Sequence, residues 1–127
     1  MIDLLYEDEC YEIQGAIFHV YRELGTGFLE AVYQECLAKE LERAGIPFVA
    51  QPELQLYYKG ELLEQIYRAD FICYDKIILE LKAVQSVAPI HKAQVLNYLK
   101  MTRLELGLLV NFGHYPKVDI TRIVNSY

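Results

Sequence analysis

The stretch LLEQIYRADFICYDKIILELK, residues 62–82, decides the fold of this chain. It contains two runs rich in Leu, Ile, Tyr and Phe, residues 62–73 and 77–82, separated by the short segment Tyr74-Asp75-Lys76. Runs of this composition bounded by turn residues are typical of β-strands. The stretch therefore predicts a hairpin of two strands at the centre of a sheet.

The turn of this hairpin sets which side chains meet. A turn centred on Asp75 places Asp70 opposite Glu80 and Arg68 opposite Lys82. Side chains alternate along a strand, so Glu80 and Lys82 share a face. Opposed carboxylates repel each other, and a divalent cation between them would remove the repulsion; magnesium and manganese prefer such oxygen ligands. The alternative is an exposed charged face on which the basic residues offset the acids.

Helical periodicity dominates the chain before the hairpin. Residues 8–24 carry apolar side chains at helical spacing. Gly25-Thr26-Gly27 interrupts the pattern, and a second helix follows, with Thr26 as its candidate N-cap and Gly45 as its stop. Strands are expected at residues 48–51 and 54–58, with a turn at residues 59–61.

The chain after the hairpin alternates between helix and strand. Pro89 begins a predicted helix at residues 89–103, followed by strands at residues 106–111 and 118–124 with a loop at residues 112–116. This order predicts an α/β (α+β) fold with a mixed sheet flanked by helices. A length of 127 residues suits one domain, which we expect to span residues 1–127.

Glu30 is a candidate functional residue of the second helix. It lies in line with a row of side chains that helical spacing turns inward: Tyr33, Leu37, Leu41 and Ala44. A carboxylate in such a row needs a partner or a metal. The alternative is that Glu30 occupies the first turn and interacts favourably with the helix dipole.

Gln94 and Tyr98 are candidates on the helix that follows Pro89. They are four residues apart and share a face, which Ile90 and Met101 extend. A glutamine there can bind a substrate phosphate or a water held by a metal. The alternative is a core glutamine satisfied by backbone groups, with Tyr98 in ordinary packing.

The composition excludes several classes of protein. No apolar stretch is long enough to span a membrane, and the acidic start is unlike a signal peptide, so we expect a cytoplasmic protein. The three cysteines have no metal-binding spacing and are expected to be reduced, mostly buried thiols, and the three histidines are equally scattered. The net charge of −6 does not by itself indicate a nucleic-acid substrate.

Several of these residues together resemble the PD-(D/E)XK nuclease superfamily. The run Gly27-Phe28-Leu29-Glu30-Ala31-Val32-Tyr33 is similar to the motif of its GxxExxY family. Asp70 followed by Glu80-Leu81-Lys82 is similar to the superfamily core, and Gln94 to Tyr98 resembles the QxxxY helix motif of RecB-like members. The resemblance covers the chain from about residue 8 to its end.

The resemblance implies a restriction-endonuclease-like fold and a set of roles. Asp70, Glu80 and the carbonyl of Leu81 would ligate magnesium or manganese, and Glu30 would be a further ligand or would position water. Lys82 would orient or activate the attacking water and stabilise charge on the phosphate. Gln94 and Tyr98 would hold substrate. A metal of this kind supplies a nucleophile from water at neutral pH and relieves developing negative charge.

Two functional hypotheses follow from the sequence. The first is a metal-dependent nuclease that hydrolyses phosphodiester bonds of DNA or RNA. The second is a regulatory or binding module that keeps the nuclease fold without turnover, for which the 11 tyrosines could furnish a protein interface. A homodimer and a protein partner are both left open, and no membrane association is expected.

Overall fold

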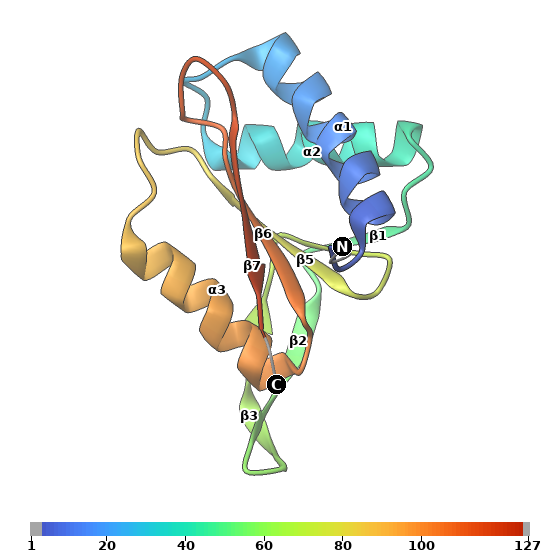
Figure 1. Ribbon diagram of the computed structural model, residues 1–127, viewed down its shortest axis with the longest axis vertical. Helices are drawn as coiled ribbons and strands as arrows, with labels where there is room; N and C mark the ends of the chain where they lie inside the picture. Colours follow the sequence, from blue (N-terminus) through green and yellow to red (C-terminus); the bar gives the residue numbers. More distant parts are fainter. Residues whose placement is uncertain (1–3, 126–127) are drawn as a thin grey trace.

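The computed structural model describes residues 4–125 as a mixed α/β fold (Figure 1). The predicted helices and strands are confirmed in type except for the single strand at residues 62–73, and the strands at Ile77–Lys82 and Leu106–Asn111 have the bounds expected. The elements in chain order are α1 (Glu7–Leu24), α2 (Glu30–Arg43), β1 (Phe48–Ala50), β2 (Glu53–Tyr58), β3 (Glu61–Arg68), β4 (Phe71–Cys73), β5 (Ile77–Lys82), α3 (Pro89–Thr102), β6 (Leu106–Asn111) and β7 (Asp119–Val124).

A five-stranded sheet in the order β1-β4-β5-β6-β7 forms the centre of the molecule. Strands β5 and β6 are parallel and are connected through α3, whereas the other neighbours are antiparallel. Crossover connections of this length are what parallel pairing requires. The fold is therefore a mixed sheet flanked by helices, as the order of elements predicts.

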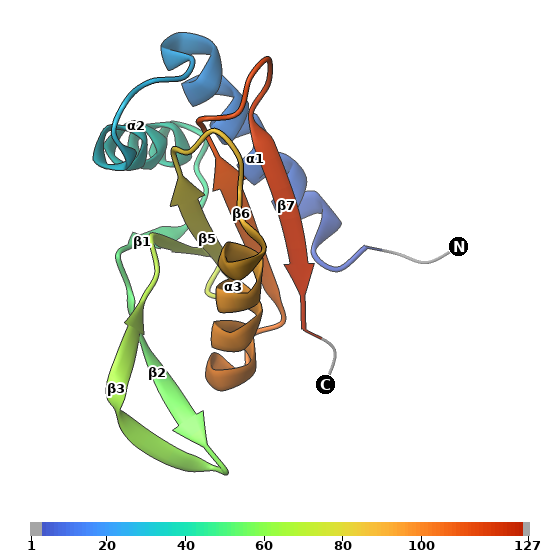
Figure 2. The ribbon, with the colours of Figure 1, turned by 90° about the vertical axis from the view of Figure 1, so that its left-hand side faces the viewer.

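Helices cover both faces of this sheet, and each face has its own core (Figure 2). Helices α1 and α2 bury one apolar cluster against Phe71, Leu79 and Leu81. Helix α3 buries a second cluster against Ile78 and Leu109 on the opposite face. The alternation of β5 between the two clusters follows from the two-residue period of a strand.

The predicted strand at residues 62–73 is wrong, because the chain breaks at Ala69-Asp70 into two strands. Strand β3 pairs with β2 in a separate hairpin, and Arg68 lies opposite Glu53 rather than Lys82. Strand β4 pairs with β1 and β5. At the break, the carbonyl of Asp70 still accepts the N–H of Gln51 at 2.8 Å beside β1, whereas its carboxylate turns toward β5 and accepts the N–H of Leu81.

The loop before α2 differs from the expected cap. The helix begins at Glu30 with Leu29 as N-cap, so Thr26 is not the cap. Instead, the hydroxyl of buried Tyr33 donates to the carbonyl of Gly25 at 2.5 Å and accepts the N–H of Phe28 at 3.4 Å. Gly27 has a φ of 107°, a conformation that favours glycine. Tyr33 thus holds the loop that delivers Glu30 to the start of the helix.

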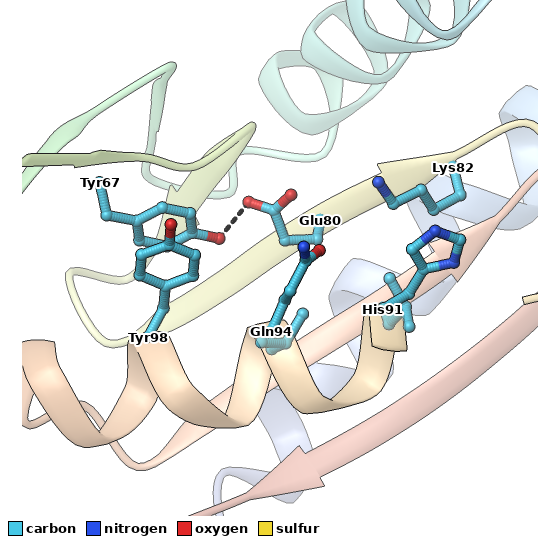
Figure 3. A pocket seen from close by; sticks show the side chains of 8 residues that line it. Tyr67, Glu80, Lys82, His91, Gln94 and Tyr98 are labelled. Atoms are coloured by element: carbon cyan, nitrogen blue, oxygen red, sulfur yellow. Dashed lines mark hydrogen bonds between the residues drawn. The ribbon is translucent and has the colours of Figure 1, made fainter. Parts of the chain in front are cut away.

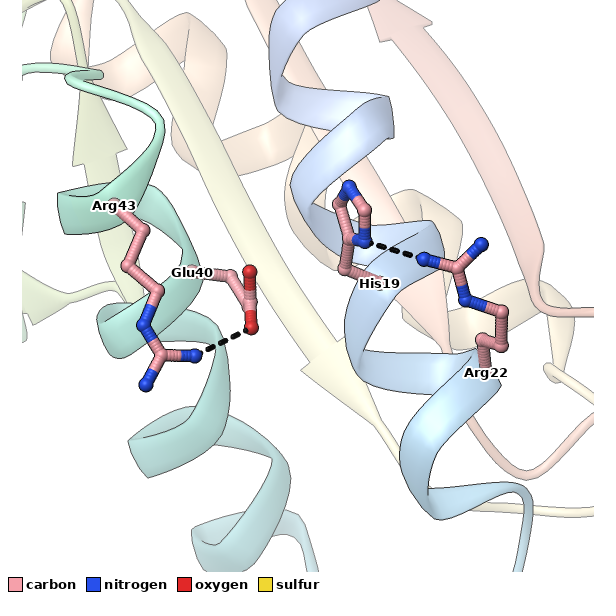
Figure 4. A network of polar contacts seen from close by, with 4 residues as sticks. All are labelled: His19, Arg22, Glu40 and Arg43. Carbon is pink, nitrogen blue, oxygen red and sulfur yellow. Dashed lines mark hydrogen bonds and ion pairs between the residues drawn. The ribbon is translucent and has the colours of Figure 1, made fainter.

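The outer surfaces of α1 and α2 carry polar pairs one helical turn apart (Figure 4). Arg22 donates to His19 at 2.7 Å, and Arg43 donates to Glu40 at 3.1 Å. Exposed pairs of this kind contribute roughly 0.5 kcal/mol or less to stability. No helix within residues 4–125 combines the length and apolar character needed to cross a membrane.

Candidate active site

A pocket lies between the second half of β5 and α3 (Figure 3). Its volume is about 150 Å³. Figure 3 shows two tyrosines at one end, a lysine and a histidine at the other, and a carboxylate between them. The lining residues are Tyr67, Glu80, Lys82, His91, Gln94, Val95, Tyr98 and Leu109.

Asp70 lies at the bend that precedes β4, one residue outside the ladder between β4 and β5. The pairs Phe71–Leu79 and Ile72–Ile78 have the register expected from a turn centred on Asp75. Where that ladder ends, the carboxylate of Asp70 accepts the N–H of Leu81 at 2.8 Å. The aspartate side chain thus occupies the position that another strand residue would fill beside β5.

Glu80 is a half-buried carboxylate beside Asp70. It accepts a hydrogen bond from the hydroxyl of Tyr67. Burial raises the pKa of Glu80 to about 7, and the negative charge of Asp70 adds to this effect. The Tyr67 hydroxyl, the backbone amide of Asp70 and the charge of Lys82 act in the opposite direction. The site therefore holds a carboxylate whose negative charge is incompletely compensated.

Asp70 has the same electrostatic character. Burial raises the pKa of its carboxyl, and the charge of Glu30 raises it further, whereas the N–H of Leu81 and the charge of Lys82 lower it. Glu30 reaches this neighbourhood from the first residue of α2, where it is exposed. The predicted inward row is confirmed for Tyr33, Leu37 and Leu41, but Glu30 and Ala44 are exposed because the row turns to solvent at both ends of the helix.

Gln94 and Tyr98 both line the pocket, as their shared helix face predicts. Gln94 is exposed, so the interpretation as a core glutamine is wrong. The ring of Tyr98 stacks on that of Tyr67, with centroids 3.8 Å apart and planes 5° from parallel. Ile90 does not extend the face into the core, because it is 59% exposed at the start of the helix.

Sequence reasoning missed Tyr67 and His91, which also line the pocket. The three residues His91, Gln94 and Tyr98 are spaced by three and four, so helical periodicity could have added His91 to the predicted face. For Tyr67 no local signal exists. Its hydrogen bond to Glu80 joins β3 to β5, which belong to different sheets.

The donor atoms at the end of β5 fit a divalent cation of the magnesium type. Lys82 turns its carbonyl toward β6, where it accepts the N–H of Phe112 at 2.8 Å. Alternate residues of a strand face opposite neighbours, so the carbonyl of Leu81 lies on the side of Asp70. Two carboxylates and a carbonyl are the oxygen ligands that such ions prefer. Among residues 4–125, however, no three carboxylate, histidine or cysteine side chains are clustered closely enough to hold a metal, so Glu30 does not complete a preformed triad.

Comparisons with known proteins agree with this fold. A model of the PD-(D/E)XK nuclease superfamily matches residues 7–123, and the chain belongs to that superfamily. The crystal structure of a protein named SSO0001 is similar, with a TM-score of 0.59 and 22% sequence identity. The match covers 96% of this chain and 61% of that one, so this chain spans less than two thirds of its length. A comparison with curated proteins finds no match.

Proposed function

We propose that this protein is a divalent-metal-dependent nuclease that hydrolyses phosphodiester bonds, within the GxxExxY branch of its superfamily. One observation carries the proposal. A hydrogen bond from the backbone N–H of Leu81 holds the carboxylate of Asp70 against β5, where Leu81 lies between Glu80 and Lys82, and the charge of Lys82 lowers the pKa of both carboxyls. A purely structural site has little need for a lysine beside two partly buried acids.

The residues divide into three roles. Asp70, Glu80 and the carbonyl of Leu81 would hold magnesium or manganese, and Glu30 would approach from α2 as a further ligand or to position water. When bound, the ion supplies charge neutralisation and a nucleophile from water at neutral pH. Lys82 would orient that water and stabilise negative charge on the phosphate. Gln94 and Tyr98 would hold the substrate in the pocket.

Cleavage assays with matched variants test this proposal. Single- and double-stranded DNA and RNA would be incubated with magnesium or manganese. Asp70→Asn and Lys82→Ala should each lower the cleavage rate about a hundredfold or more. The first removes the negative charge that would hold the metal, and the second removes the positive charge that would stabilise the phosphate. The controls Asp75→Asn and Lys92→Ala alter exposed residues that do not line the pocket and should leave the rate unchanged. Cleavage that persists in both site variants, or in the presence of a chelator, would contradict the proposal.

A non-catalytic binding module is the second candidate, favoured by exposed aromatic residues on α1. Tyr11 and Phe18 are 75% and 52% exposed and lie seven residues apart, on one side of the helix. Metal calorimetry separates the candidates. Binding of magnesium or manganese at millimolar concentration that is lost in Asp70→Asn supports the nuclease. Absence of metal binding, together with a stable complex that Tyr11→Ser disrupts, supports the module.

A further inference from the structure

His91 is a pocket residue to which no role has yet been assigned. It lies in the first turn of α3 and faces the same cavity as Glu80 and Lys82. Figure 3 places His91 and Lys82 together at one end of the pocket, away from Tyr67 and Tyr98. Its imidazole is therefore available to whatever binds beside the lysine.

The start of α3 fixes which nitrogen of His91 carries the proton. The backbone N–H of Ala88 points at Nδ1 at 3.2 Å, and a backbone N–H can only donate. The ring must accept that hydrogen bond with Nδ1, so the neutral ring carries its proton on Nε2. The N–H of His91 in turn donates to the carbonyl of Ala88 at 3.0 Å, which holds the residue in the first helical turn. The backbone thus orients Nε2 as a hydrogen-bond donor.

The donors around this end of the pocket suit an anion. The ammonium of Lys82, the Nε2–H of His91 and the amide of Gln94 line the same cavity. A cavity of about 150 Å³ corresponds to roughly five water molecules at liquid density, which is room for a phosphate group. Cationic and N–H donors are the groups that bind phosphate oxygens in proteins.

We propose that His91 binds the substrate, with its Nε2–H donating to a non-bridging oxygen of the phosphate that Lys82 contacts. The inference rests on the proposed nuclease function and extends it to a residue outside the core motif. Loss of the Nε2 proton from a neutral ring would leave an imidazolate. His91 therefore acts as a hydrogen-bond donor and not as the acid that protonates the leaving group.

Nitrogen-15 NMR of the full chain with inorganic phosphate and magnesium tests this directly. Before titration, the His91 resonances should be those of a ring with Nδ1 as acceptor and Nε2 protonated. Added phosphate should shift the Nε2 resonance far more than that of Nδ1, a response that a residue serving only to cap the helix would not give. Phosphate binding that leaves His91 unmoved, or no phosphate binding at all, would overturn the inference.

Two near-isosteric variants separate the pocket role from the helix role. His91→Gln keeps a pocket donor and, at the third helical position, an oxygen that can accept the Ala88 N–H. His91→Met has neither. Phosphate affinity should fall about tenfold in His91→Met and much less in His91→Gln, because a hydrogen bond to a charged group is lost only in the former. Thermal unfolding of both variants would identify any loss due to misfolding.

The inference and the proposed function can fail separately. Phosphate binding at His91 in a protein that cleaves no nucleic acid would overturn only the nuclease proposal. Metal-dependent cleavage that His91→Met leaves unchanged, in a variant that unfolds like the wild type, would overturn only the role of His91.

Discussion

The two faces of β5 carry different chemistry along the same six residues. On the side of α1 and α2, Ile77, Leu79 and Leu81 are at most 1% exposed. On the side of α3, the strand changes from fully buried Ile78 to half-buried Glu80 and Lys82. One face is apolar throughout and stabilises the fold, whereas the other becomes charged toward its end and forms the site.

Close packing of α3 explains where this change occurs. Gly107 pairs with Ile78, and a side chain there would lie 2.8 Å from Cγ1 of Val95 on α3. The missing side chain lets the helix approach the sheet closely at this level. Two residues further along, Glu80 pairs with Leu109 and both line the pocket. Polar groups are tolerated on β5 where the helix no longer seals the sheet from water.

The largest predicted effect on stability concerns the apolar face. Leu79→Ala should lower the free energy of unfolding by about 3 to 4 kcal/mol, because it leaves a cavity between the sheet and α1 and α2. Lys82→Ala, three residues away on the other face, should change it by about 1 kcal/mol or less. Urea denaturation measures both. Equal losses of unfolding free energy in the two variants would contradict the view that only the apolar face of β5 stabilises the fold.

A pH-dependent effect is expected on the charged face. Because the pKa of folded Glu80 is raised to about 7 from 4.5, its contribution to stability is greatest at low pH and falls as the pH rises between these values. Glu80→Gln does not titrate, so the metal-free variant should become more stable than the wild type by up to about 3 kcal/mol near neutral pH, levelling off above it.

Denaturation curves of the metal-free protein across this pH range check that expectation. The matched control Glu64→Gln replaces an exposed glutamate on β3 and should follow the wild-type curve. If the free energies of unfolding of Glu80→Gln and the wild type differ by the same amount at every pH, burial does not raise the pKa of the Glu80 carboxyl.

A smaller effect than that of Leu79→Ala is predicted for Tyr33, a buried residue of α2 on the apolar side of the sheet. Its ring is buried and stacks on Phe112 at 4.5 Å, while its hydroxyl holds the loop before Glu30. Tyr33→Phe should cost about 1 kcal/mol, the usual value for a lost hydrogen bond. Urea denaturation should show no change for Tyr11→Phe, whose ring is 75% exposed. An equal effect of the two changes would mean that the Tyr33 hydroxyl does not stabilise the loop.

Local pattern was sufficient to predict much of the fold. The strands β5 and β6 are short, mostly apolar runs, and their bounds follow from the residues alone. The register of β4 against β5 followed from the three-residue turn around Asp75. These features depend on residues that are close together in the chain, so they can be predicted from local sequence patterns.

Other features depend on contacts between distant segments. The break at Asp70 was not predictable, because residues 62–73 contain no glycine or proline. The contact that accompanies the break is the hydrogen bond from the N–H of Leu81 to the carboxylate of Asp70, a residue distant in sequence. The hydrogen bond from Tyr67 to Glu80 and the exposure of Glu30 likewise depend on tertiary packing. The sequence was sufficient to identify the candidate acidic residues, but not to predict their burial, their hydrogen-bond partners or the pKa shifts that result.

Anomalous diffraction from crystals soaked in manganese tests whether Asp70 and Glu80 hold a metal. One strong peak is expected at the end of β5, bound by carboxylate oxygens of Asp70 and Glu80, because hard divalent ions prefer oxygen ligands. The peak should disappear in Asp70→Asn. A peak only at other surface carboxylates, or none at millimolar manganese, would contradict a metal-dependent site at these residues.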